Sequence, residues 1–544
     1  MKLNIQKIFT LTLIPLLLSA CSDNTESDKV KTIASDDKPI SNFVSVTGGT
    51  IRGNAREDGL IEYLGIPYAA PPIGDRRWQS PAPLAAWEGE RDSTSFGLPC
   101  YQPGSLSAFY DRTYEKMSED CLTLNVWTRA EQTSDALPVM VWIHGGALVM
   151  GSGMDYDGSS LTRKGVILVT INYRLGPFGF YAHPELSAEG KGHSGNQGYK
   201  DQIAALNWVQ ENIRQFGGDP NNVTIFGESA GSWSMSVMQA SPMARGLFDK
   251  IIGQSGARFV PLPDLKKARW GMPSAEERGE TLASMFAQTD APDLDVLRTL
   301  SAESIIGAYA ADPALLFDFD SMTIVDGQVL PEEVNTIFDQ GRQADVPVMI
   351  GSNADEATTF DPAIGATSPI DYVELHTQFV DLTLGGDKRK ALLLYPDTPE
   401  FARDSYIRFN TDANFTQPMR QWANYMDNVS SEVYLYWWNW RPVINGSDEY
   451  ASFHAAEIPY VFGDLAMFNI EVSEREEAFS ETMMTIWTNF AKNSDPSSKG
   501  IINWPAYAED KPMTAVLGAE IGLEGGVRSE QVRVITAGYD ARRD

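Results

Sequence analysis

The middle of the chain alternates short apolar runs with longer segments of helical periodicity. Residues 137–143 (LPVMVWI), 166–171 (VILVTI) and 223–226 (VTIF) have the length and the β-branched content of buried strands. Between the second and third runs, residues 198–216 carry apolar side chains at helical spacing, and the GGDP sequence at 217–220 stops that helix. This alternation predicts an α/β fold, with a mostly parallel sheet and helices on both faces.

Two more strand-like runs follow later in the chain, at 346–350 (VPVMI) and 433–440 (VYLYWWNW). The three tryptophans of the second run are interpreted as core residues. Ligands of such a sheet bind beyond the carboxyl ends of its strands, so polar residues that follow strands are the candidates for chemistry. Asp355 and Glu356 come shortly after the first run, and His454 lies fourteen residues beyond the second.

The pentapeptide GESAG at residues 227–231 follows the strand predicted at 223–226 and precedes a segment without helix breakers. Ser229 is therefore expected at a sharp strand-to-helix turn, where the flanking glycines avoid collision with neighbouring backbone. Upstream, the run at 137–143 ends in HGGA at 144–147. Backbone N–H groups of such a glycine-rich turn can stabilise an oxyanion.

The chain order serine, acid, histidine is that of α/β-hydrolases. A serine hydroxyl needs a base within hydrogen-bond reach and a third group that orients the base. The hypothesis is that Ser229 is the nucleophile and His454 the general base. Spacing alone does not decide between Asp355 and Glu356 as the orienting carboxylate.

Eight segments of the chain resemble the type-B carboxylesterase and cholinesterase-like family. Within that family the chain resembles a bacterial carboxylesterase lipoprotein. The resemblance spans residues 65 to about 465 and implies the α/β-hydrolase fold, with inserted cap and loop regions, and the hydrolysis of carboxylic esters through an acyl-enzyme. The matching segments are GIPYAAPPIGDRRW from Gly65, SEDCLTLNVW from Ser118, HGGA from His144, NYRLGPFGF from Asn172, DQIAALNWVQENIRQFGGDPNNVTIFGESAG from Asp201, DGQVLPEEV from Asp326, NADEATTF from Asn353 and HAAEIPYVFG from His454.

The family pattern assigns the acid role to Glu356, although the glycine expected after it is Ala357 here. It places the oxyanion hole at the backbone N–H groups of Gly146, Ala147 and Ala230. The family often has glycine at position 147, and the alanine methyl group is expected to disfavour esters of tertiary alcohols.

Several other residues are given supporting roles. The resemblance makes Ser255 a residue near the site, and His144 is expected to orient the HGGA loop. Asp219 is expected to serve a turn and Glu457 an ion pair. The parts expected to set substrate specificity are residues 257–320 and 367–428.

Other functions share parts of this sequence pattern. Some members of the superfamily are adhesion or binding proteins, which typically lack a triad residue; this chain keeps all three. A lipase, an amidase or a transacylase would use the same triad. In cholinesterases the loop corresponding to Cys100–Cys121 carries a tryptophan that stacks on choline, and this loop has none, so a choline ester specialist is not expected.

Composition limits the partners. The 544 residues are 43% hydrophobic and 10% aromatic and carry a formal net charge of −30, which disfavours nucleic acid and anionic membrane surfaces. No zinc-type spacing, GxGxxG motif or phosphate loop occurs, so no cofactor and no metal is predicted. The expected partner is a small-molecule ester; oligomeric state is not indicated.

The N-terminus predicts export. Residues 1–20 have a basic start and an apolar stretch too short to span a bilayer. The sequence LSAC at 18–21 resembles a bacterial lipobox, which implies cleavage before a lipidated Cys21 and, with Ser22 next, an outer-membrane location. Residues 21–43 would form a disordered tether and 44–544 a single catalytic domain. The alternative is a secreted protein cut after Ala20.

Cys100 and Cys121 are the two cysteines left after export. In an exported chain such a pair predicts a disulfide. Two free buried thiols are the alternative.

Overall fold

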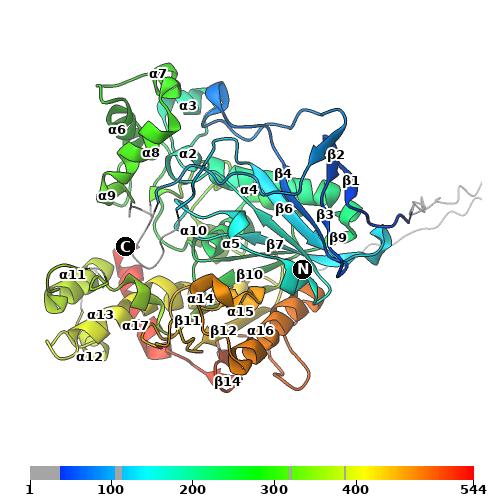
Figure 1. The fold of residues 1–544 in the computed structure, drawn as a ribbon. Helices are drawn as coiled ribbons and strands as arrows, with labels where there is room; N and C mark the ends of the chain where they lie inside the picture. Colours follow the sequence, from blue (N-terminus) through cyan, green and yellow to red (C-terminus); the bar gives the residue numbers. More distant parts are fainter. Residues whose placement is uncertain are drawn as a thin grey trace, which may run out of the picture. The chain divides into compact units, whose positions relative to one another are not determined.

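The predicted strands assemble into one large mixed sheet in the computed structural model, which describes residues 37–104, 113–316, 318, 321–364, 366–384 and 388–543 (Figure 1). Residues 38–544 form one compact unit. The signal segment and Cys21 lie outside the described residues.

The large sheet has eleven strands in the order β14-β13-β12-β11-β10-β9-β7-β8-β6-β4-β3, and β1, β2 and β5 form a small second sheet. From β8 through β7 and on to β13, neighbouring strands are parallel, whereas both edges of the large sheet are antiparallel. The strands are β1 Phe43–Val46, β2 Gly49–Arg52, β3 Asn54–Ala55, β4 Ile61–Pro67, β5 Glu90–Asp92, β6 Thr123–Thr128, β7 Leu137–Ile143, β8 Ile167–Ile171, β9 Gly218–Glu228, β10 Lys250–Gln254, β11 Val348–Asn353, β12 Val433–Trp438, β13 Met513–Leu517 and β14 Gly522–Gly525.

Helices connect the strands and form two groups at one end of the sheet, α6–α9 and α11–α13 with α17 (Figure 1). The α-helices are α1 Ser159–Thr162, α2 Gly176–Gly179, α3 Pro184–Glu189, α4 Gln197–Asn212, α5 Ala230–Ala240, α6 Ala275–Ala287, α7 Leu294–Thr299, α8 Ala302–Ala310, α9 Pro313–Leu316, α10 Val334–Asp339, α11 Tyr372–Leu384, α12 Arg389–Leu394, α13 Ala402–Thr411, α14 Gln417–Tyr425, α15 Ile458–Phe462, α16 Glu474–Asn493 and α17 Ser529–Arg543.

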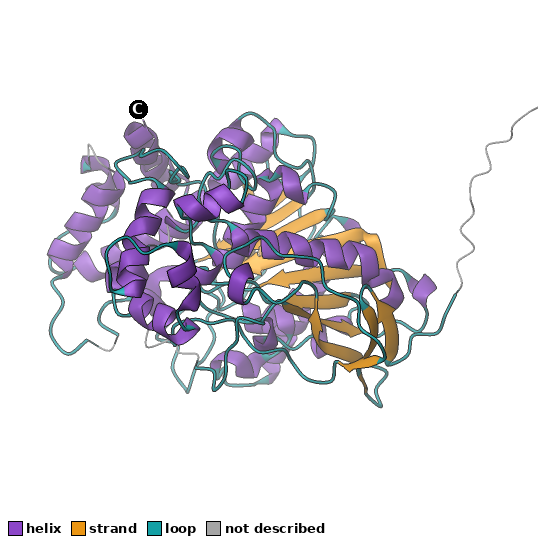
Figure 2. Ribbon diagram, turned by 90° about the horizontal axis from the view of Figure 1, so that it is seen from above, coloured by secondary structure: helices purple, strands orange, loops and turns teal. Residues whose placement is uncertain are grey.

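Strand β7 shows how the sheet separates two hydrophobic cores. Successive side chains of a strand point to opposite faces. Val139 and Val141 pack in the core that includes the apolar faces of α4 and α5. Met140 and Trp142 pack in the core that includes α15 and α16. Figure 2 shows helices, in purple, packed on the strands, in orange. The fold is therefore the predicted one, with helices on both faces of a central sheet.

The structure moves two predicted strand boundaries. Strand β9 starts at Gly218 rather than Val223, because Gly217, with a φ of 82°, ends the preceding helix and the chain turns directly into the sheet. Strand β11 continues to Asn353, where it still pairs with Trp438 of β12. The carboxyl end of β11 therefore lies one residue before Ala354, which brings Asp355 and Glu356 closer to the sheet than predicted.

The predicted disulfide is confirmed, since Cys100 and Cys121 are bonded at an S–S distance of 2.00 Å. Within the described residues, no helix is both long and apolar enough to cross a membrane. The same residues contain no cluster of histidine, cysteine and acidic side chains suited to a metal ion.

Candidate active site

Ser229 stands at the junction between β9 and α5, as the GESAG motif predicts. Its backbone has φ 54° and ψ −120°, an unusual conformation for a residue with a side chain. A strained turn of this kind lifts the serine hydroxyl above the end of the sheet. Its amide donates to the carbonyl of Gln254 at 2.8 Å, which ties the turn to strand β10.

Close backbone packing explains the two glycines of the motif. A Cβ atom on Gly231 would lie 2.0 Å from the carbonyl oxygen of Ile143, and one on Gly227 would lie 2.5 Å from the same oxygen. Both distances are far below van der Waals contact. The turn therefore needs glycine on each side of Ser229 in order to sit against the end of β7.

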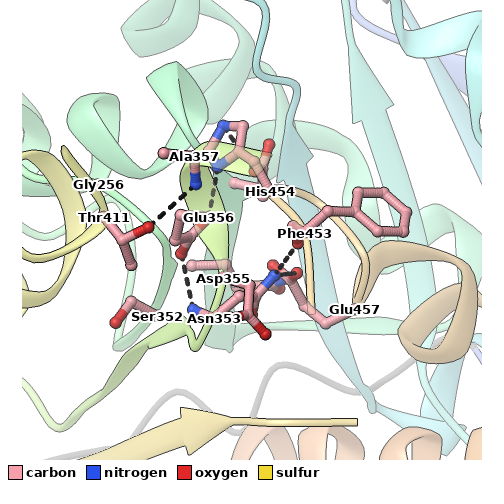
Figure 3. A network of polar contacts seen from close by, with 12 residues as sticks. Gly256, Ser352, Asn353, Asp355, Glu356, Ala357, Thr411, Phe453, His454 and Glu457 are labelled. Atoms are coloured by element: carbon pink, nitrogen blue, oxygen red, sulfur yellow. Dashed lines mark hydrogen bonds and ion pairs between the residues drawn. The ribbon is translucent and has the colours of Figure 1, made fainter. Parts of the chain in front are cut away.

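His454 and Glu356 meet beyond the carboxyl ends of β11 and β12 (Figure 3). His454 Nδ1 lies 2.7 Å from Glu356 Oε2, and Glu356 Oε1 accepts a hydrogen bond of 2.7 Å from the amide of Asn353. Glu356 is fully buried and His454 is 4% exposed. With both of its oxygens engaged, Glu356 is held in one orientation and fixes the ring of His454.

Asp355, the neighbouring acid, is used differently. Its amide donates to the carbonyl of Ser452 at 3.1 Å, and the amide of Ser452 donates to Asp355 Oδ2 at 3.2 Å. This reciprocal pair, called here the Asp355–Ser452 bridge, joins the two loops that carry Glu356 and His454. Asp355 therefore has a structural position.

Glu228, which the sequence reasoning did not single out, also faces the histidine. Its Oε1 lies 3.1 Å from His454 Nε2, and its side chain is buried. Burial raises the pKa of the Glu228 carboxyl well above its ordinary value. Burial by itself lowers the pKa of His454, but the carboxylates of Glu228, Glu356 and Glu457 outweigh it and raise that pKa to about 9. The only signal in the sequence was the position of Glu228 directly before the serine.

The three candidate oxyanion-hole residues either line the same cavity as Ser229 or follow it directly in the chain. Within the described residues, the amides of Gly146 and Ala147 donate to no other group. Ala230 is the first residue of α5, where an amide has no acceptor inside its own helix. Gly146 and Ala147 line the cavity above Ser229, whereas Ala230 is fully buried and does not line it.

A cavity of about 680 Å³ opens above Ser229 and His454. Phe360 and Phe415 pack against the His454 ring at centroid distances of 5.2 and 4.7 Å. The rest of the lining is mainly apolar, and the two parts expected to set specificity contribute to it with residues 257–260 and with several residues between Tyr406 and Pro418. A cavity of this size and character fits a small organic molecule.

The supporting residues fall mostly where the sequence placed them. His144 stacks on Tyr173 at a centroid distance of 4.5 Å, and its Nδ1 lies 2.8 Å from the carbonyl oxygen of Gly145 in the HGGA loop. Asp219 accepts from the amide of Asn221 at 2.9 Å, which is turn chemistry. Ser255 is buried, with a φ of 55°, directly after β10.

The prediction of an ion pair for Glu457 is wrong. Its carboxylate instead accepts from the side-chain amides of Gln254 at 3.0 Å and Asn353 at 2.6 Å. Burial raises the pKa of this carboxyl. Two neutral amides satisfy its oxygens in a site where a cation would also have to lose its water.

Comparison with known proteins agrees with this geometry. Residues 40–534 match the sequence profile of the Carboxylesterase family. The para-nitrobenzyl esterase of Bacillus subtilis (strain 168) is 36% identical over 504 residues, covering 90% of this chain and 97% of that protein. The liver carboxylesterase 1F of Rattus norvegicus is 31% identical over 534 residues, covering 91% of each.

Solved structures give the same result. A PNB esterase structure superposes with a TM-score of 0.76 at 36% identity, covering 91% of this chain and 99% of that one. The Geobacillus stearothermophilus carboxylesterase EST55 superposes with a TM-score of 0.78 at 31% identity, covering 91% of this chain and 100% of that one. The fold is thus that of the α/β-hydrolases. The chain belongs to the carboxylesterase family and is a carboxylic ester hydrolase.

Proposed function

We propose that this carboxylesterase works through Ser229, His454 and Glu356. Ser229 Oγ attacks the carbonyl carbon of the ester while His454 Nε2 takes its proton. His454 then protonates the departing alcohol, which leaves an acyl group on Ser229. Water attacks the acyl-enzyme with His454 again as base, and the carboxylic acid is released. The 2.7 Å contact between His454 Nδ1 and Glu356 Oε2 is the observation that carries this proposal. Because Glu356 engages Nδ1, it orients the ring and leaves the other nitrogen, Nε2, to act as the base.

The oxyanion formed in each step is assigned to the amides of Gly146, Ala147 and Ala230. The unengaged amides of Gly146 and Ala147 and the helix position of Ala230 support the assignment. Such donors are already oriented before the reaction, so they stabilise the developing charge without reorganisation. Loss of one donor of this type typically lowers kcat roughly a hundred- to a thousandfold.

The cavity supports small esters as substrates. Its apolar lining suits the hydrocarbon parts of an acyl or alcohol group, and its volume of about 680 Å³ lies in the range of sites for small organic ligands. The same catalytic groups would serve a lipase, so chain-length preference is the property that separates the two.

The N-terminal sequence supports a second part of the proposal, that the enzyme is an exported bacterial lipoprotein. Cleavage before Cys21 and lipidation of that residue would anchor it, most simply in the outer membrane. Mass spectrometry of the N-terminal peptide tests this: a diacylglyceryl-modified Cys21 supports it, and an unmodified chain that starts at Cys21 contradicts it.

Hydrolysis of p-nitrophenyl esters from acetate to palmitate tests the catalytic proposal. The full-length protein should hydrolyse the short esters, and Ser229→Ala should lower kcat by roughly a millionfold. Ser255→Ala is the matched control, because Ser255 is also a buried serine with positive φ at the end of a strand. Equal loss in both variants, or full activity in Ser229→Ala, would contradict the assignment.

A further inference from the structure

A second cavity, of about 290 Å³, lies next to the loop that carries Glu356. It shares no lining residue with the catalytic cavity. The residues that line it are Ala354, Asp355, Arg408, Thr411, Asp412, Trp437, Asn439, Arg441, Ser452 and Arg528. Three of these ten are arginines, in a chain whose net charge is −30.

The three guanidinium groups come from separate parts of the chain. Arg408 is in the last turn of α13, Arg441 follows β12, and Arg528 directly precedes α17. Their convergence on one cavity is therefore a product of the fold and not of a basic stretch of sequence. We propose that this cavity binds a small oxyanion, a carboxylate or a phosphate.

The two acids in the cavity, Asp355 and Asp412, do not neutralise all three arginines. Asp412 is 2% exposed and is engaged by Arg528 through Nε at 3.1 Å and through Nη2, and it also accepts from the Tyr395 hydroxyl at 2.6 Å. Asp355 accepts from Ser452 in the bridge. The charge of Asp412 is thus already balanced inside the protein.

The guanidinium groups of Arg408 and Arg441 have N–H donors that no described residue accepts. Arg408 is exposed and makes no side-chain hydrogen bond or ion pair with any described residue. Arg441 has a 60% exposed side chain, and its contact with Asp355, 3.9 Å from Nη2 to Oδ2, is too long for a hydrogen bond. Each guanidinium presents five N–H donors in a planar fork that matches the oxygens of carboxylates and phosphates.

The acidic surface of the protein does not prevent such binding. Exposed charges are screened beyond about 8 Å at physiological ionic strength. An anion in the cavity lies within that distance of the arginines that line it. The local arginines therefore outweigh the distant acids for an anion that has reached the cavity.

Isothermal titration of the full-length protein with inorganic phosphate and with citrate, at constant ionic strength, tests the site. At least one of these anions should bind and raise Tm, and the comparison identifies the preferred oxyanion. Arg408→Gln and Arg441→Gln should each weaken binding roughly tenfold or more, as expected for hydrogen bonds to charged groups. Arg214→Gln, which removes an exposed arginine from the turn at 213–216, should bind like the unaltered protein.

The proposed anion site is separate from catalysis, so binding can be measured whether or not the enzyme is active. The control is the Tm of each variant. An unchanged Tm in the absence of anion shows that the variants are folded. The proposal is overturned if neither anion binds at concentrations well above millimolar, or if the double variant Arg408→Gln/Arg441→Gln binds as tightly as the unaltered protein.

Discussion

Glu228 Oε1 lies 3.1 Å from Nε2 of His454, the ring nitrogen that takes the proton of Ser229 in the proposed mechanism. The residue that precedes the proposed nucleophile thus places a second carboxylate on the proposed base, opposite Glu356. A buried carboxylate in this position stabilises the imidazolium that forms when Ser229 attacks. It also makes the histidine and Glu228 compete for one proton.

Replacing Glu228 with glutamine should therefore shift the pH dependence of the enzyme. Glu228 raises the pKa of His454, and the neutral imidazole is the active base, so removing this carboxylate lowers that pKa. The acidic limb of kcat/KM should move to lower pH, while kcat on the plateau falls about ten- to a hundredfold through loss of a charged contact. A pH–rate profile with p-nitrophenyl acetate measures both. An acidic limb that stays in place or moves upward would contradict this role for Glu228.

The Asp355–Ser452 bridge should matter for turnover although neither residue takes part in the chemistry. Asp355→Ala removes the acceptor for the Ser452 amide, which is one of the two hydrogen bonds of the bridge, and so loosens the loop that carries His454. We expect kcat to fall about tenfold with little change in KM, since a misplaced base affects the reaction more than binding. Asp355→Asn keeps an oxygen acceptor and should recover most of the loss. If asparagine is as damaging as alanine, the charge rather than the bridge is responsible.

Ala147 should limit the alcohols that the enzyme accepts. Its φ of 55° suits glycine, and its methyl group lies on the wall of the cavity beside the proposed oxyanion hole. Ala147→Gly should raise the rate on tert-butyl acetate relative to n-butyl acetate, measured as a ratio in the same preparation. A ratio that does not change would show that another part of the cavity excludes branched alcohols.

The disulfide should contribute to stability. Cys100 and Cys121 are 21 residues apart, and closing a loop of this length is worth about 3 kcal/mol in the chain-entropy model. The double variant Cys100→Ser/Cys121→Ser should lose about that much in free energy of unfolding by urea denaturation. A reducing agent should destabilise the unaltered protein and leave the variant unchanged. Equal stability of the oxidised protein and the variant would refute this contribution.

Most of the candidate site could be predicted because its residues follow strands. GESAG after β9 and HGGA after β7 carry local signals, namely glycines where the backbone of neighbouring strands approaches closely. The choice of Glu356 over Asp355 needed the family resemblance, because two adjacent acids on a loop look alike in sequence. In the structure their different partners separate them at once.

Long-range contacts account for what the sequence did not predict. Glu228 meets a histidine more than 200 residues away, and Glu457 is satisfied by amides from β10 and β11 rather than by a cation. Trp437, expected in the core, is only half-buried and lines the second cavity, whereas Trp438 and Trp440 are buried as predicted. No periodicity along the chain records such pairings.

Covalent labelling with a fluorophosphonate, followed by peptide mass spectrometry, tests the central claim most directly. The reagent captures an activated serine in the form that mimics the acyl-enzyme. We expect one label per chain, located on Ser229, with parallel loss of p-nitrophenyl acetate hydrolysis, and no label in His454→Ala. A label on Ser255 or another serine, or full esterase activity after complete labelling of Ser229, would contradict the assignment of the nucleophile.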